Sequence, residues 1–224
     1  MTCQHCCFAC NKNGEDMPFE MFQDIMRKWA YRLDFENKWI VIGGGEPTLH
    51  PKFWKIMSCA MSFGIPWVAT NGSNTQDALT LARLGGRNKI RAVLSQDKWH
   101  DPIEQYVIDA FKNGLKRERY GWWDEKDASN AREIRTVVYP YAGGRCDTGV
   151  KSCPCRGVQI RPNGNIFACG CEDAPMVGTV KDGFFEEYKD IPWFDKCYKE
   201  WGKETKIVVK PEKKEIIPHK PPIN

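Results

Sequence analysis

The chain has 224 residues, of which 42% are hydrophobic, and a formal net charge of +4. This composition excludes disorder of the whole chain, and the length allows one large or two small domains. The charge is too small to indicate a nucleic-acid partner by itself, although such a partner is not excluded. No apolar run approaches the roughly eighteen residues of a membrane span, so we expect a cytoplasmic protein without membrane association.

Four of the eleven cysteines lie within the first ten residues, as Cys3, Cys6, Cys7 and Cys10. No apolar run of secretory type accompanies them, which favours a thiolate metal site over disulfides. The spacing Cys3-x3-Cys7-x2-Cys10 suits a [4Fe–4S] cluster whose fourth iron stays open to a small ligand. The pairs Cys3–Cys6 and Cys7–Cys10 would equally suit a tetrahedral zinc site. These ten residues do not decide between the two metals.

Predicted helices and strands alternate after the cysteines. The 3.6-residue periodicity predicts helices over residues 16–33, 51–63, 77–84 and 101–111. Short apolar runs predict strands over residues 39–42, 67–70, 90–95 and 134–139, and the first of these, Trp39 to Ile42, is expected to be buried on both faces. The alternation predicts an α/β fold with a parallel sheet whose site lies at the carboxyl edge, as in open or closed barrels.

Glycine or polar residues end each predicted strand. The first strand ends at Gly43-Gly44-Gly45-Glu46-Pro47-Thr48, a loop whose backbone must be closely approached. Glu46 can accept a hydrogen bond from an ammonium group. The next two strands end at Asn71 and at the segment from Ser95 to Asp97, and His100 follows three residues later.

A second group of cysteines surrounds a predicted hairpin. Asn163-Gly164 predicts a two-residue turn, and its arms bring together two cysteine pairs, Cys153 with Cys155 and Cys169 with Cys171. Four thiolates suit a closed iron–sulfur cluster or a zinc site equally well. Cys146 and Cys197 are spare ligands or plain thiols.

The N-terminal cysteines and Gly44-Gly45-Glu46-Pro47 at a strand end together resemble the radical S-adenosylmethionine enzymes. The resemblance implies that Cys3, Cys7 and Cys10 hold a [4Fe–4S] cluster whose open iron binds S-adenosylmethionine. An electron from a donor such as flavodoxin or ferredoxin would then cleave it to a 5′-deoxyadenosyl radical. The family fold is a partial (β/α)6 TIM-like barrel of about six units. The resemblance also implies the residues that bind S-adenosylmethionine. The methionine amino group would be bound by Gly44, Gly45 and Glu46. The methionine carboxylate and the ribose hydroxyls would be bound by Asn71, Ser95 and Asp97.

The second cysteine group resembles the twitch module of the peptide-modifying branch with SPASM domains. The match rests on Cys153-x10-Gly164-x4-Cys169, Gly178-Thr179-Val180 and Phe184-Phe185. It implies a second, auxiliary [4Fe–4S] cluster and a peptide or protein substrate. Within the family, a nucleoside or small metabolite is the alternative substrate. A non-catalytic zinc-binding protein, with one site in each cysteine group, is the alternative of another class, but it does not explain the glycine loop.

The resemblance divides the chain into three parts and shows three departures from the family. We expect a barrel over residues 1–140, a twitch-like module over 141–200 and a basic, extended tail over 201–224. Only Met1 and Thr2 precede the cysteines where the family has its first strand, so we expect a barrel that begins late or is shortened. Ala9 occupies a position where the family has an aromatic residue, and Cys6 is an extra thiol.

Overall fold

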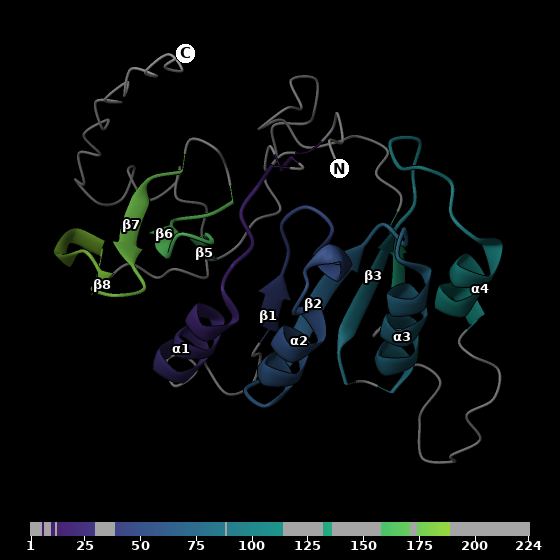
Figure 1. Ribbon diagram of the computed structural model, residues 1–224, viewed down its shortest axis with the longest axis horizontal. Coiled ribbons are helices and arrows are strands. Elements are labelled where there is room, and N and C mark those ends of the chain that lie inside the picture. Colours follow the sequence, from purple (N-terminus) through teal and green to yellow (C-terminus); the bar gives the residue numbers. More distant parts are fainter. Residues whose placement is uncertain are drawn as a thin grey trace, which may run out of the picture.

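The computed structural model describes residues 6, 10–11, 13–29, 39–87, 89–113, 132–135, 158–170 and 174–188. These ranges form a four-stranded parallel sheet, in the order β1-β2-β3-β4, and a four-stranded antiparallel sheet, in the order β5-β6-β7-β8 (Figure 1). The alternation of helices and strands and the parallel sheet predicted from the sequence are confirmed.

The parallel sheet contains β1 (Trp39–Ile42), β2 (Ile65–Thr70), β3 (Arg91–Ser95) and β4 (Arg132–Arg135). The α-helices associated with it are α1 (Phe19–Trp29), α2 (Phe53–Met61), α3 (Thr75–Gly86) and α4 (Gln105–Asn113), and a short 3-10 helix, η2 (Pro47–Leu49), precedes α2. Each strand pairs with the next one along the chain, so the order has no reversal. Because all these pairs are parallel, the residues that follow the strands meet at one edge.

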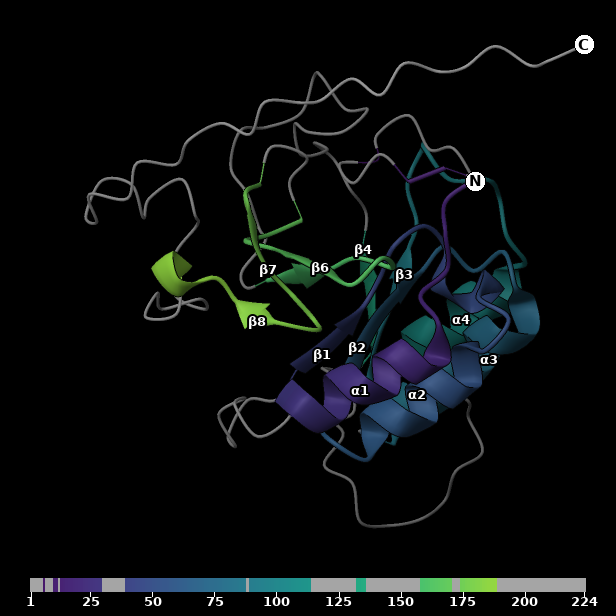
Figure 2. The same ribbon diagram turned by 60° about the vertical axis from the view of Figure 1, so that its left-hand side comes forward.

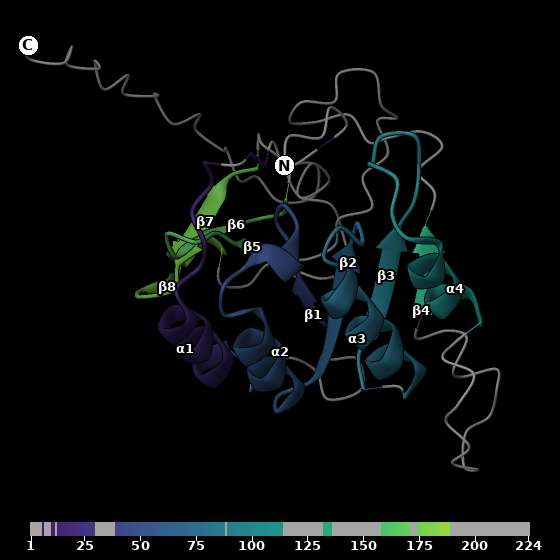
Figure 3. The ribbon, with the colours of Figure 1, turned by 45° about the vertical axis from the view of Figure 1, so that its right-hand side comes forward.

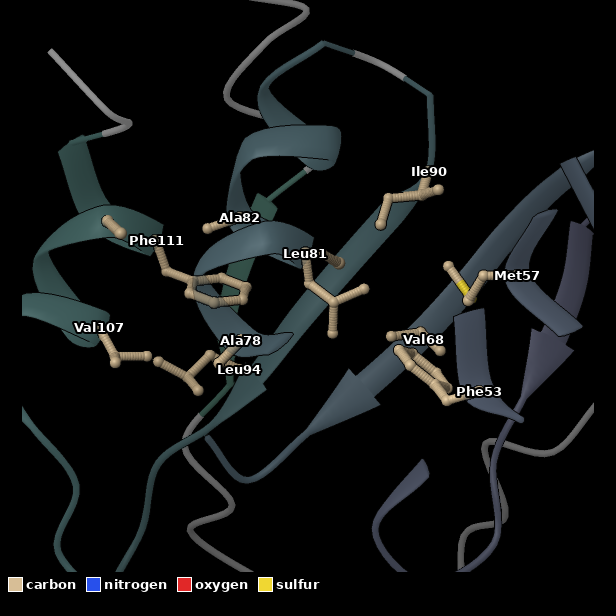
Figure 4. Packing of buried hydrophobic residues seen from close by; sticks show 12 residues of the cluster. Phe53, Met57, Val68, Ala78, Leu81, Ala82, Ile90, Leu94, Val107 and Phe111 are labelled. Carbon is tan, nitrogen blue, oxygen red and sulfur yellow. The ribbon is translucent and has the colours of Figure 1, made fainter. Parts of the chain in front are cut away.

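The helices lie on one face of the parallel sheet, as Figures 2 and 3 show from two further directions. Their apolar sides pack on alternate strand residues in a core that Figure 4 shows from close by, with Met57, Val68, Leu81 and Leu94 each fully buried. Burial of an apolar side chain of this size stabilises the fold by roughly 1.5–3 kcal/mol. In the helix predicted over residues 51–63, Phe53, Ile56, Met57 and Ala60 follow helical spacing, and all four are buried.

The opposite face of the sheet is more open. Ile40 is buried, whereas Trp39 is 43% and Val41 65% exposed. The prediction that β1 is buried on both faces is therefore wrong. In the described ranges, the helices that follow β1, β2 and β3 return along the same face of the sheet, so only one side of β1 contacts them.

Several element boundaries differ from those predicted. The helix predicted from Asp101 begins at Gln105, and the strand predicted from Ile134 begins at Arg132. Residues 136–139 of that predicted strand lie outside the described ranges. The partial barrel of six units stays a prediction, since the described ranges contain four strands of such a sheet. None of the helices in those ranges is long and apolar enough to cross a membrane.

The antiparallel sheet contains β5 (Gln159–Ile160), β6 (Asn165–Phe167), β7 (Met176–Thr179) and β8 (Gly183–Phe184), followed by a 3-10 helix, η3 (Glu186–Tyr188). The predicted hairpin is confirmed as β5 and β6. Its turn differs from the prediction, because Arg161 pairs with Asn165 and three residues separate them. The Gly164 N–H donates to the Arg161 carbonyl, and Gly164 has a φ of 84°. This is the three-residue form, a type I turn followed by a left-handed glycine.

The two sheets are joined through α1. Val180, which follows β7, is 9% exposed and packs in a cluster with Phe22 and Met26 of α1 and Ile40 of β1. The Lys28 ammonium donates to the Val180 carbonyl at 3.2 Å. A methyl group on Gly164 would lie within 4 Å of the Met21 side chain. The hairpin is thus attached to the first helix of the parallel sheet.

Candidate functional site

The Glu46 carboxylate lies at the carboxyl edge of the parallel sheet, in the loop after β1. Its Oε1 accepts from the Thr48 N–H at 3.2 Å, the Thr48 hydroxyl at 2.7 Å and the Thr70 hydroxyl at 2.8 Å. Its Oε2 accepts from the Asn71 N–H at 2.7 Å. Thr48 and Thr70 are 4% and 1% exposed. Glu46 therefore fixes the loop after β1 against the end of β2.

This network qualifies the predicted role of Glu46. A carboxylate offers about four acceptor positions, and Oε1 alone serves three donors here. A further donor such as an ammonium group therefore has to bind at Oε2. The prediction that Glu46 binds an ammonium group directly stays a prediction, and the exposed carbonyls of the preceding glycines are a second set of acceptors for it.

The glycine loop lies beside Cys10. A methyl group on Gly45 would be 3.9 Å from the Cys10 Cβ. Among described residues, no atom lies within 4 Å of a Cβ built on Gly43 or Gly44, and Gly44 has a φ of 134° that favours glycine. A thiol and open backbone thus face one edge of the sheet. This donor set fits the predicted group, since a thiolate suits iron and carbonyls suit an ammonium.

The other predicted ligands of the first metal centre, Cys3 and Cys7, lie outside the described ranges, whereas the bystander Cys6 lies within them. Of the predicted auxiliary ligands only Cys169 is described, and it is 3% exposed just after β6. Cys153, Cys155, Cys171, Cys146 and Cys197 are outside. In the part of the chain that the structure describes, no three His, Cys, Asp or Glu side chains converge on a common point. Both metal centres stay predictions.

Asn71 lies one residue beyond β2 and is 7% exposed. Its backbone binds Glu46, and its side-chain Oδ1 accepts from the Ser73 N–H at 2.8 Å. Next to it, a cavity of about 400 Å³ opens between residues 71–75 and residues 101–104, with Asn71, Ser73, Asp101 and Glu104 among its walls. The segment after β2 and the loop before α4 therefore border a space of ligand size.

Ser95 ends β3 and is half-buried, while Asp97 is directed into its own loop. The Asp97 side chain is 1% exposed. Its Oδ1 accepts from the Trp99 N–H at 2.9 Å and lies 2.9 Å from His100 Nδ1. The Asp97 Oδ2 is buried and has no hydrogen-bond partner among the described residues. The predicted contact of Asp97 with the ribose would need that atom to become accessible.

Cys59 lies away from this edge, in the cluster between α1 and α2. Burial raises the pKa of the Cys59 thiol, and the positive charge of Arg27 offsets only part of the rise. A raised pKa keeps the group a neutral thiol, which is a weak nucleophile and a poor metal ligand. The structure therefore gives Cys59 a packing role.

Comparisons with known proteins do not assign the chain to a family. No protein-family model matches it. No curated protein is significantly similar to it.

The sequence interpretation missed Thr48 and Thr70 as partners of Glu46. Both stand at recognisable places, since Thr48 lies two residues after Glu46 in the same loop and Thr70 ends the neighbouring strand. A buried threonine at a strand end beside a carboxylate indicates a hydrogen bond once the strand order is known. The sequence predicts both strands but gives no direct measure of their register.

Proposed function

We propose that the chain is a radical S-adenosylmethionine enzyme that acts on a peptide or protein side chain. The observation that carries the proposal is the position of Cys10 beside Gly45, at the strand end that Glu46 organises. Zinc binding alone would not require this arrangement of thiol, open glycine backbone and anchored carboxylate. The unreversed strand order with helices on one face agrees with a barrel wall, because doubly wound sheets carry helices on both faces.

Cys3, Cys7 and Cys10 would hold the cluster, which together with bound S-adenosylmethionine would supply the 5′-deoxyadenosyl radical. The residues of this chain would bind and orient the cofactor. The carbonyls of residues 43–45 and Glu46 Oε2 are available acceptors for an ammonium group. Asn71 is held in place by its bonds to Glu46 and Ser73, so its side chain would enter the site pre-oriented.

The twitch-like module favours a peptide over a nucleoside or small metabolite as substrate. Cys169 is buried beside β6, in a sheet that packs on α1, so an auxiliary centre there would be fixed to the barrel. Genes beside this one that encode a short precursor peptide would support a peptide substrate, and a nucleoside-metabolising neighbourhood would favour the alternative.

Anaerobic reconstitution of the full chain with iron and sulfide tests the proposal. We expect visible absorption from thiolate-to-iron charge transfer and about four or eight irons per chain, for one or two clusters. With dithionite and S-adenosylmethionine, 5′-deoxyadenosine should form. Colourless protein that retains stoichiometric zinc after this treatment, and forms no 5′-deoxyadenosine, would support the non-catalytic zinc-binding alternative.

A further inference from the structure

The open face of the parallel sheet carries two arginine–tryptophan pairs. The Arg91 guanidinium carbon lies 5.5 Å from the centre of the Trp39 ring, and that of Arg135 lies 5.5 Å from the centre of the Trp67 ring. Alternation along the strands places all four residues on the face turned away from the helices. Both distances are within the range of a cation–π contact.

Glu133 lies between the two arginines on the same face. Its carboxylate is 3.7 Å from an Arg91 terminal nitrogen, and accepts from Arg135 Nε at 3.1 Å and Nη2 at 3.3 Å. Two guanidinium groups have more donors than one carboxylate can use. The Arg91 Nε is buried without a hydrogen-bond partner among the described residues. Among the described residues, these three side chains thus have an excess of donors and a net positive charge of one.

Apolar surface adjoins these charges. Trp39, Val41 and Ile65 are 43%, 65% and 43% exposed and come from adjacent strands. Parallel sheets are normally covered on both faces, so apolar exposure here indicates a surface that binds something. Its chemistry matches an acidic group beside an apolar one.

We propose that this face binds an acidic side chain of the peptide substrate. Its carboxylate would accept from the donors of Arg91 and Arg135 that Glu133 leaves unused, and an apolar neighbour would lie on Trp39 and Val41. This inference rests on the proposed function. The position of Glu133 demonstrates that a carboxylate suits the spacing of the two arginines. A nucleic acid suits the face less well, because a net charge of one gives little counterion release.

Two rhodamine-labelled heptapeptides of alanine and leucine, with glutamate or glutamine at the centre, test the inference by fluorescence anisotropy on the full chain. We expect the glutamate peptide to bind about ten-fold more tightly, the size of one charge-assisted hydrogen bond. Replacing both arginines, as Arg91→Gln with Arg135→Gln, should abolish the preference. Arg83→Gln, an exposed arginine of α3 on the helical side, is the matched control and should retain it.

Glu133→Gln gives a test in the opposite direction. Removing the internal carboxylate should tighten binding of the glutamate peptide several-fold, a result that misfolding cannot produce. Equal affinity for both peptides, binding of neither, or a preference that survives in the double arginine variant would overturn the inference. Displacement of the peptide by an equimolar single-stranded oligonucleotide would also overturn it, in favour of nucleic acid.

The assay also separates this inference from the proposed reaction. Formation of 5′-deoxyadenosine without any glutamate preference would reject the peptide-binding face alone. A glutamate preference without 5′-deoxyadenosine would reject the proposed reaction and leave the face as a binding surface.

Discussion

Glu46 joins two neighbouring strand ends through four hydrogen bonds, and all four donors are threonine hydroxyl or backbone groups of buried residues. A carboxylate in this position acts first on structure, because it satisfies donors that burial separates from water. Besides any direct contact at Oε2, it would act on a ligand through the positions of the glycine loop and Asn71.

Thr70→Val should destabilise the fold by about 1.5–3 kcal/mol, since the variant keeps the shape but removes a donor to a charged group and the acceptor of the buried Gly72 N–H. The midpoint and slope of urea denaturation measure the change. Thr80→Val is the control, because its hydroxyl donates to the Gln76 carbonyl in the same helix at an exposed position. Equal effects of the two substitutions would mean that the Glu46 network contributes little.

Cys59 makes stability depend on pH. Its thiol ionises less readily in the folded chain than in the unfolded chain, so its contribution is present at low pH and lost as pH rises through the raised pKa. Between about pH 8 and 10, wild type should lose unfolding free energy relative to Cys59→Ala. Urea denaturation of both proteins at each pH measures the difference between their unfolding free energies. The titration of all other groups is common to both proteins and cancels in this difference. A difference that stays constant with pH would contradict this.

At the scale of elements, the loop between β1 and η2 depends on backbone geometry. Gly44 has a positive φ while Gly43 does not, and neither would meet a described residue through a methyl group. The two positions therefore differ in backbone conformation, because only Gly44 has a φ that side chains disfavour, and not in the space around them.

Gly44→Ala should cost about 1–2 kcal/mol of stability, because an L side chain is strained at this φ, and Gly43→Ala should cost little. Thermal or urea denaturation of the two variants gives the comparison. If the loop binds S-adenosylmethionine, both added methyl groups should also weaken its binding. An unfolding free energy of Gly44→Ala equal to that of wild type would show that the loop adopts another backbone conformation without loss of stability.

The sequence predicted the strands and the helix faces because local patterns determine them. Trp39–Ile42 and the buried side of α2 follow from β-branched runs and helical spacing. The exposure of one face of β1 could not be predicted from its sequence, since burial depends on which other segments pack against the strand. Similarly, Gly44 to Glu46 were located from sequence, but Thr48 and Thr70 required the register between strands. The hairpin was predicted, yet its three-residue turn depends on pairing that Asn163-Gly164 does not specify.

At the scale of the whole molecule, the contact at Val180 links the two described sheets through α1. Val180 is buried among residues of α1, α2 and β1, so the antiparallel sheet and the first helix should stabilise each other.

Val180→Asp should therefore destabilise both units by at least about 2 kcal/mol, because it places an unpaired charge in an apolar cluster. Hydrogen exchange followed by mass spectrometry should show faster exchange in α1 and in β6 and β7. Lys181→Asp, at the exposed next position, is the control and should change neither. Faster exchange confined to β6 and β7 would mean that the sheets are energetically independent.

Under the proposed function, the Cys10 thiol beside the glycine loop belongs to a radical S-adenosylmethionine centre. Formation of 5′-deoxyadenosine by anaerobically reconstituted wild type, Cys10→Ala and Cys59→Ala tests it most directly. Cys59→Ala removes a thiol that lies away from the site and should leave the product unchanged, whereas Cys10→Ala should abolish it. Wild type that carries its full iron and forms no 5′-deoxyadenosine, or Cys10→Ala that matches wild type, would contradict the claim.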